Sequence, residues 1–184
     1  MAFCKGFELK IFCVANQKGG VGKTTTTVNL AAGLASIGQR VLLVDLDPQG
    51  NATMGSGVDK RELALSVYDV LLASATVAEC RVKTPWAESG QATYDVLGAN
   101  RELAGAEIEL VGLDQRELRL RHALQAVTQD YDFVLIDCPP SLSLLTLNGL
   151  CAAHGVLVPM QCEDRKSTRL NSSHMSESRM PSSA

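Results

Sequence analysis

The chain has 184 residues, of which 46% are apolar, and its formal net charge at pH 7 is -3. This length and composition suit one globular domain with a substantial core. The last 21 residues hold four basic and two acidic residues, which leaves 13 basic and 18 acidic residues in the preceding part. That acidic balance argues against a DNA-binding face built from overall composition.

No targeting or membrane segment is expected. The sequence contains no run of 18 apolar residues, and residues 1–10 lack the continuous apolar stretch of a secretory signal. A cytoplasmic protein with no membrane partner is therefore predicted.

The first pattern along the chain is a strand, a glycine-rich turn and a helix. Residues 11–15 are apolar and rich in β-branched or aromatic side chains, which predicts a buried strand. A helix is expected from Gly22 or Lys23, with Gly38 at its left-handed end. Its inward-facing residues are expected to be Val28, Leu30, Ala31, Leu34 and Ala35.

Strands and helices alternate along the rest of the chain. Asp114 is the expected N-cap of a helix that places Leu120, Leu124 and Val127 on one face. The alternation predicts an α/β fold with a doubly wound, mostly parallel sheet. The predicted strands are 41–46, 94–97, 133–137 and 156–160; the predicted helices are 66–73, 100–110, 114–128 and 142–153, with a loop over 47–51.

The segment 18–25, Lys-Gly-Gly-Val-Gly-Lys-Thr-Thr, is the most specific signal in the chain. Glycines let backbone N–H groups turn toward phosphate oxygens, and the following helix offers its N-terminal dipole to the same charge. Lys23 is expected at the β- and γ-phosphates, the Thr24 hydroxyl on Mg²⁺, and Thr25 near the α-phosphate. The predicted nucleotide-binding residues are Gly19, Gly20, Val21, Gly22, Lys23, Thr24 and Thr25.

Two other interpretations of the glycines remain open. A glycine-rich turn with an incidental lysine explains the composition, but it does not require a strand, a loop and a helix in this order. A dinucleotide-binding fold is suggested by Gly20 and Gly22 after a strand and by Asp45 at the end of the next one. The third glycine of that motif is missing, so the phosphate-binding loop is preferred.

Three acidic residues lie where a metal site is expected. Asp45 and Asp47 are two residues apart at the carboxyl end of strand 41–46, the side on which open α/β sheets bind ligands. Asp137 ends the apolar run 133–136, the Walker B arrangement that delivers a carboxylate to magnesium. Thr24, Asp45 and Asp137 are the predicted metal ligands, although each acid alone is also explained as a turn or strand-end residue.

Segments 16–25, 41–51 and 133–141 together resemble the ParA/Soj partition ATPases, a P-loop family with a deviant Walker A motif. The resemblance covers about residues 10–163, so residues 1–163 are expected to form one ATPase domain. In that family the lysine matching Lys18 crosses a nucleotide-sandwich dimer to reach the partner's phosphates. The acid matching Asp47 positions or activates the attacking water, so Lys18, Lys23 and Asp47 are the implied catalytic residues.

The resemblance also implies a function. ATP with Mg²⁺ is expected to drive homodimerisation, and the dimer is expected to bind DNA without sequence preference. A ParB-type partner then stimulates slow hydrolysis, which implies a nucleoid-associated protein that segregates chromosome or plasmid DNA. The alternatives are a MinD-like membrane-positioning ATPase and an inactive fragment that binds nucleotide weakly or not at all.

After residue 163 the sequence departs from the family pattern. Seven of the final 21 residues are serine, and no periodic apolar face remains. Residues 164–184 are therefore predicted to be a disordered and non-native tail, which leaves the sheet incomplete at its C-terminal end.

Overall fold

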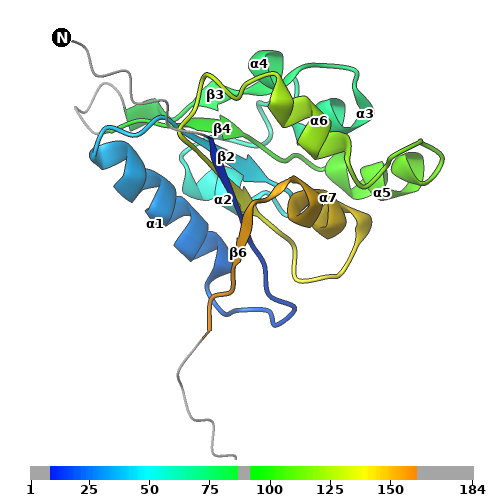
Figure 1. The fold of residues 1–184 in the computed structure, drawn as a ribbon, viewed down its shortest axis with the longest axis horizontal. Coiled ribbons are helices and arrows are strands. Elements are labelled where there is room, and N and C mark those ends of the chain that lie inside the picture. Colours follow the sequence, from blue (N-terminus) through cyan, green and yellow to red (C-terminus); the bar gives the residue numbers. More distant parts are fainter. Residues whose placement is uncertain (1–8, 87–91, 161–184) are drawn as a thin grey trace, which may run out of the picture.

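The computed structural model describes residues 9–86 and 92–160 (Figure 1). Six strands form one sheet in the order β3-β4-β2-β5-β1-β6. The doubly wound, mostly parallel fold predicted from the sequence is confirmed, whereas the predicted tail at 164–184 lies outside the described residues. The parallel strands are β1 (Lys10–Val14), β2 (Val41–Asp45), β4 (Asp95–Leu97), β5 (Phe133–Asp137) and β6 (Gly155–Leu157); β3 (Val82–Lys83) pairs antiparallel with β4.

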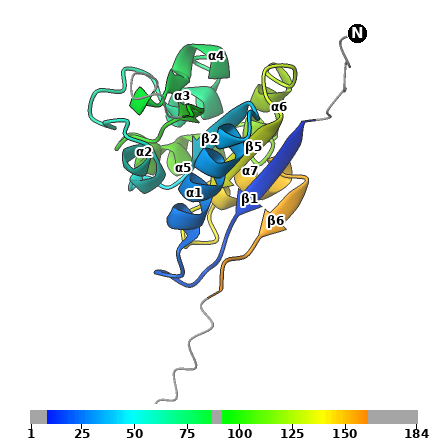
Figure 2. The same ribbon diagram turned by 90° about the vertical axis from the view of Figure 1, so that its left-hand side faces the viewer.

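Helices cover both faces of this sheet. Helix α1 packs on one face, and α3, α5, α6 and α7 lie on the other (Figures 1 and 2). The helices are α1 (Lys23–Ser36), α2 (Asn51–Gly55), α3 (Val67–Leu72), α4 (Val77–Cys80), α5 (Leu103–Val111), α6 (Arg119–Gln125) and α7 (Leu144–Ala152).

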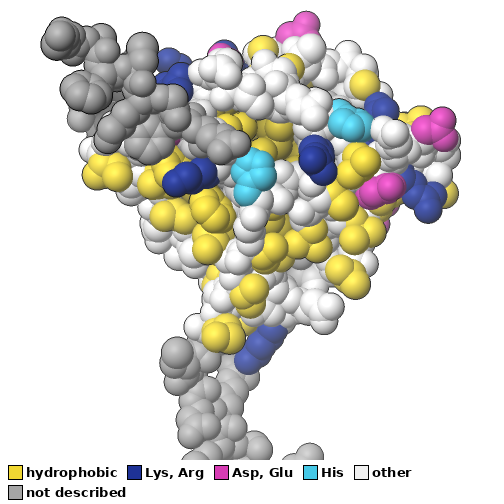
Figure 3. Space-filling model, viewed as in Figure 1, with side chains coloured by type: hydrophobic (Ala, Val, Ile, Leu, Met, Phe, Trp, Pro, Cys, Tyr) yellow, Lys and Arg dark blue, Asp and Glu magenta, His cyan; other side chains and the backbone are white. Residues whose placement is uncertain are grey.

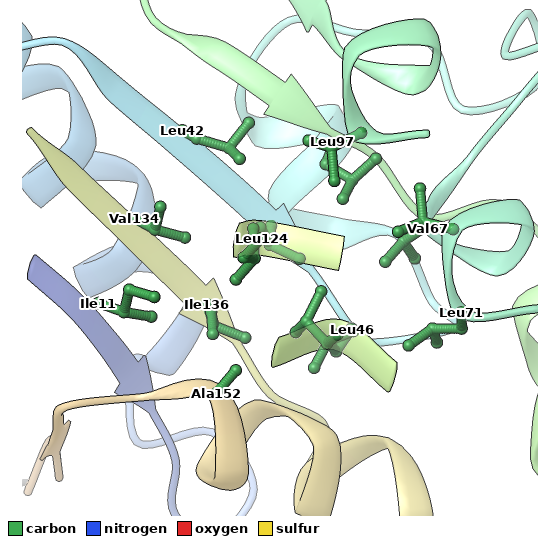
Figure 4. Packing of buried hydrophobic residues seen from close by; sticks show 14 of the residues in the cluster. Ile11, Leu42, Leu46, Val67, Leu71, Leu97, Leu124, Val134, Ile136 and Ala152 are labelled. Atoms are coloured by element: carbon green, nitrogen blue, oxygen red, sulfur yellow. The ribbon is translucent and has the colours of Figure 1, made fainter. Parts of the chain in front are cut away.

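The first four residues of β2 are all apolar because helices cover both faces of the sheet. Val41 and Leu43 belong to the cluster under α1, whereas Leu42 and Val44 belong to the cluster on the opposite face. Successive side chains of a strand point to opposite faces, so a strand covered on both sides needs apolar residues at every position. Figure 4 shows the larger cluster, in which Leu124 of α6 lies among side chains from the sheet.

Two predicted helices differ from the structure in detail. In α1, Ala31 and Ala35 are buried as predicted, while Val28, Leu30 and Leu34 are only partly buried. The helix predicted over 114–128 begins at Arg119, and the N-cap at Asp114 is wrong.

A residue from another helix sets the start of α6. The Leu120 N–H donates to Asn148 Oδ1 of α7 at 3.1 Å, so a tertiary contact supplies the N-terminal hydrogen bond that the sequence assigned to Asp114. Gln115 has a φ of 51°, a left-handed conformation that interrupts a continuous helix from residue 114. Leu120 and Leu124 are buried, as predicted for one face of this helix.

Three short elements were not predicted from the sequence: α2, α4 and β3. Helix α4 carries a capping box in which the Thr76 side chain accepts from the Glu79 N–H and the Glu79 carboxylate accepts from the Thr76 N–H. The Thr-x-x-Glu spacing was the available signal for this helix.

Strand β6 forms one edge of the described sheet. Val156 of β6 and the following Val158 and Met160 have exposed side chains. Leu142, just before α7, and Leu147, within α7, are also exposed. Hydrophobic side chains accordingly gather over β6 and α7 in the space-filling view (Figure 3). Among the described residues, every helix is too short or too polar to cross a membrane.

Candidate nucleotide-binding site

The loop between β1 and α1 depends on glycine for its backbone conformation. Gly20 has a φ of 72°, and Gly22, at the N-cap of α1, has a φ of 86°. A Cβ added at either position meets no atom within 4 Å, so conformation, and not lack of space, requires glycine here. The loop therefore continues directly into the first turn of α1, where the backbone N–H groups have no hydrogen-bond acceptor within the helix.

This loop forms one wall of a cavity of about 670 Å³. The other walls come from the loops that follow β2 and β5, and β5 lies between β1 and β2 in the sheet. The carboxyl ends of three neighbouring parallel strands thus surround one cavity, on the side where open α/β sheets bind ligands. Its lining residues are Gly19, Gly20, Gly22, Lys23, Thr24, Thr25, Asp47, Pro48, Gln49, Asn51, Pro139, Pro140 and Ser141.

Two threonines of α1 hold the Asp137 carboxylate. Thr24 Oγ1 donates to Asp137 Oδ2 at 2.7 Å, and Thr27 Oγ1 donates to Asp137 Oδ1 at 3.1 Å. Asp137 is fully buried at the end of β5 and lies outside the cavity lining, in direct contact with the lining residue Thr24. The structure thus brings together Thr24 and Asp137, which lie 113 residues apart in the chain.

The buried position of Asp137 alters its acidity. Burial raises the pKa of this carboxyl group to about 6, against the lowering effect of the Thr24 and Thr27 hydrogen bonds. The negative charge of Asp47 raises the pKa further, and the Lys23 cation lowers it. The carboxyl group of Asp137 therefore changes its charge near pH 6.

The two lysines of the loop have different surroundings. Lys23 is buried, and its Nζ lies 3.5 Å from the Lys18 carbonyl oxygen. Lys18 is exposed and does not line the cavity; its N–H donates to Asn16 Oδ1 at 2.9 Å. Val21 is also buried and lies outside the lining, and its predicted role in nucleotide binding stays a prediction.

Asp45, the last residue of β2, and Asp47, in the loop that follows, have different positions relative to the cavity. Asp47 lines the cavity, and its Oδ1 accepts from the Gln49 N–H at 2.9 Å. Asp45 is fully buried and lies outside the lining; its oxygens accept hydrogen bonds from Asp47 and Thr53. The metal-binding role of Asp45 stays a prediction, and these contacts support a different role.

Several residues of the site were not singled out from the sequence. Thr27 lies three residues after Thr24 and so on the same face of α1, which was a usable signal. Pro139, Pro140 and Ser141 line the cavity because they follow β5 directly, a position that the strand prediction already contained. Thr53 carried no sequence signal, because its partner Asp45 is known only from the fold.

Comparison with known proteins agrees with this geometry. A family model described as an AAA domain matches residues 9–172, which is most of the chain. The chain belongs to this AAA-domain family. Its P-loop class of nucleotide-binding proteins is the one that the loop, the cavity and the sheet order indicate.

Curated relatives of this AAA domain include proteins named Soj and ParA. The sporulation initiation inhibitor protein Soj of Bacillus subtilis is 56% identical over 154 residues, covering 84% of this chain and 59% of the relative. The chromosome partitioning protein ParA of Caulobacter vibrioides is 48% identical over 157 residues, covering 84% and 57%. These relatives confirm the resemblance to the ParA/Soj proteins, and the chain spans less than three fifths of their length.

Solved structures share the fold of this AAA domain. A structure named cobyrinic acid a,c-diamide synthase from Mycobacterium smegmatis, with an ATP analogue and magnesium bound, has a TM-score of 0.79 at 49% identity. It covers 84% of this chain, which spans 61% of that one. A plasmid partition protein from Borrelia burgdorferi has a TM-score of 0.71 at 24% identity, with 85% and 68% covered, and supports the fold alone.

Proposed function

We propose that this chain binds ATP with Mg²⁺ in the cavity at the carboxyl ends of β1, β2 and β5, and that it hydrolyses ATP as a partition protein. The observation that carries this proposal is the Thr24 to Asp137 hydrogen bond of 2.7 Å at a cavity walled by the glycine-rich loop. It joins the two residue types that P-loop proteins use to hold magnesium, a hydroxyl after the loop lysine and a strand-end carboxylate.

The residues of the cavity fit a nucleoside triphosphate and a divalent cation. The loop from Gly19 to Gly22 offers backbone N–H groups to phosphate oxygens, and Lys23 supplies a cation next to them. Oxygen donors are what Mg²⁺ prefers, and Thr24 and Asp137 supply them together. When bound, Mg²⁺ neutralises charge on the phosphate oxygens.

Hydrolysis requires a water molecule next to the γ-phosphate. The water oxygen forms a bond to the γ-phosphorus while the bond from that phosphorus to the β,γ-bridging oxygen breaks, giving ADP and phosphate. Asp47 is the acid that lines the cavity, and its carboxylate is the group that orients this water and accepts its proton. Lys18, exposed beside the cavity, is available to a second copy of the chain.

The wider role follows from the relatives named Soj and ParA. We infer an ATP-dependent homodimer that associates with DNA without sequence preference in the cytoplasm, at the nucleoid, and works with a ParB-type protein. Support comes from 48% identity to a protein named chromosome partitioning protein ParA and 56% identity to one named Soj. The domain that performs the nucleotide chemistry is taken as residues 1–163.

The proposal is tested by nucleotide binding. Lys23→Ala is expected to weaken binding of a fluorescent ATP analogue with Mg²⁺ by at least about tenfold, because it removes the cation at the phosphates. Lys83→Ala is the matched control, because Lys83 is an exposed lysine on β3 and lies outside the cavity lining. Equal affinity of the two variants contradicts the assignment of the site.

Partner binding needs its own measurement. Light scattering with ATP and Mg²⁺ is expected to show a doubling of mass, and the same sample is expected to be retained on non-specific DNA and not on anionic lipid vesicles. Retention on vesicles alone overturns the partition role and favours membrane positioning. If the protein binds nucleotide but neither dimerises nor binds DNA, the proposed nucleotide site is retained and the partition role is rejected.

A further inference from the structure

The carboxyl group of Asp45 lies outside the cavity lining, and both of its oxygens accept hydrogen bonds from the protein. Its Oδ1 accepts from the Asp47 N–H at 3.1 Å. Its Oδ2 accepts from both the N–H and the hydroxyl of Thr53, each at 2.8 Å. All three of these donors belong to the segment 47–53, so the Asp45 carboxylate is anchored to the turn that carries Asp47.

Thr53 connects three parts of the fold through one hydroxyl. It lies in α2 and is fully buried. Its Oγ1 donates to Asp45 at the end of β2 and accepts from the Ala99 N–H, just after β4, at 3.0 Å. The start of α2 is thereby tied to the carboxyl ends of two neighbouring strands.

The turn between Asp45 and Thr53 is the one that carries Asp47. The Gly50 N–H donates to the Asp47 carbonyl at 2.8 Å, which closes the turn. A Cβ at Gly50 would lie 3.0 Å from the Ala99 carbonyl oxygen, and one at Gly98 would lie 2.9 Å from Thr53 Cγ2. The packing behind this turn leaves it little freedom to shift.

We propose that Asp45 and Thr53 are positioning residues: together they fix the Asp47 backbone so that the Asp47 carboxylate faces the nucleotide cavity. The role in hydrolysis rests on the proposed function, whereas the fixing of the turn does not. Asp45 acts through the Asp47 N–H, and Thr53 acts by holding the second oxygen of Asp45. Removal of the Thr53 hydroxyl loosens the turn without touching the loop that holds phosphate.

The decisive pair of variants is Thr53→Val and Thr53→Ser. Valine keeps the shape of threonine but loses the hydroxyl, and serine keeps the hydroxyl but loses a methyl group. Three quantities are measured on the whole chain: amide hydrogen exchange over residues 46–51, the Kd of an ATP analogue with Mg²⁺, and kcat for ATP hydrolysis.

In Thr53→Val, exchange over 46–51 is expected to accelerate at least about tenfold, because a buried carboxylate loses one of its donors. kcat is expected to fall by about tenfold while Kd stays within about threefold, because the phosphate-binding loop is intact. Thr53→Ser is expected to restore both exchange and kcat. Unchanged exchange in Thr53→Val, or equal loss of Kd and kcat, overturns the proposal.

Asp45→Asn separates positioning from metal binding. If Asp45 positions Asp47, the gain in nucleotide affinity on adding Mg²⁺ in place of EDTA survives in this variant; its loss makes Asp45 a metal ligand and overturns the proposal. A wild-type chain without ATPase activity refutes the proposed hydrolysis, and the exchange measurement still decides whether Thr53 fixes the turn.

Discussion

Asp45 and Asp137 are register partners at the ends of β2 and β5, yet their carboxyl groups accept hydrogen bonds from different segments of the chain. Asp45 accepts from the turn behind the cavity, and Asp137 accepts from the helix that follows the phosphate loop. Burial raises the pKa of Asp45 to about 7 and that of Asp137 to about 6, and the charge of Asp137 contributes to the shift of Asp45. Two acids at equivalent strand ends thus have different partners.

The raised pKa of Asp137 predicts a pH dependence of Mg²⁺-assisted nucleotide binding. Below about pH 6 this carboxyl group is mostly protonated and neutral, and above it the group is mostly the carboxylate that attracts a cation. The gain in affinity on adding Mg²⁺ is expected to rise by about tenfold between about pH 5 and pH 7. Titration with an ATP analogue in Mg²⁺ and in EDTA measures it, and Asp137→Asn reports the titration of the nucleotide itself. A gain that falls as pH rises contradicts the prediction.

Because Lys18 is exposed, its replacement is expected to lower the rate of ATP turnover without weakening nucleotide binding. Because Lys18 lies outside the cavity lining, Lys18→Ala is expected to leave the Kd of an ATP analogue within about threefold of the wild-type value. Turnover is expected to fall at least about tenfold, since we propose that this lysine acts on the partner's phosphates. The comparison uses steady-state phosphate release at increasing protein concentration. A proportional loss of affinity and turnover would place Lys18 in its own chain's site instead.

Two helix glycines are expected to respond in opposite directions to alanine. A Cβ at Gly149 in α7 would lie 2.8 Å from Cys138 Sγ, so Gly149→Ala is expected to destabilise the fold by about 1–3 kcal/mol. A Cβ at Gly33 in α1 meets nothing within 4 Å, so Gly33→Ala is expected to stabilise it by about 0.5–1 kcal/mol. Urea unfolding of both variants checks the sign, and equal effects would show that crowding at Gly149 is relieved elsewhere.

Tyr131 is expected to stabilise the amino end of the sheet through its hydroxyl. The Tyr131 OH donates to Asp95 Oδ2 at 2.7 Å and accepts from Arg81 Nη1 at 2.6 Å. Tyr131→Phe removes the buried hydroxyl that Asp95 and Arg81 share, while Arg81 keeps its hydrogen bond to Asp130, and the expected loss is about 1–3 kcal/mol. Tyr68→Phe removes an exposed hydrogen bond to Glu109 and is expected to leave the unfolding midpoint unchanged. Similar midpoints for the two variants contradict the prediction.

The sequence predicted those parts of the fold that are decided locally. Strands β1, β2 and β5 occupy the centre of the sheet and are covered on both faces, so each appears as a continuous apolar run. The loop 18–25 was recognisable because its glycines, lysine and threonines have a fixed spacing. Both features can therefore be predicted without knowledge of any contact between residues far apart in the chain.

The remaining features depend on residues far apart in the chain. The start of α6 is set by Asn148 of α7, 28 residues from Leu120. Asp45 and Asp137 follow the same pattern of an apolar run ending in an acid. Their hydrogen-bond donors distinguish them: Asp47 and Thr53 for Asp45, and Thr24 and Thr27 for Asp137. Strand β3 has two residues and α4 has four, which is too short for a periodic pattern to be detected.

The position of β1 in the sheet has a consequence for how the protein is made. Cys13 of β1 and Cys138 after β5 bring their sulfur atoms within 3.2 Å of each other, although they are 125 residues apart in the chain. Both neighbours of β1, which are β5 and β6, leave the ribosome long after it. The order of synthesis therefore delays assembly of the nucleotide site, because non-local strand pairing has to wait for the later strand. A nascent chain that stops before residue 133 carries all of segment 18–25 and yet lacks the strand that supplies Asp137.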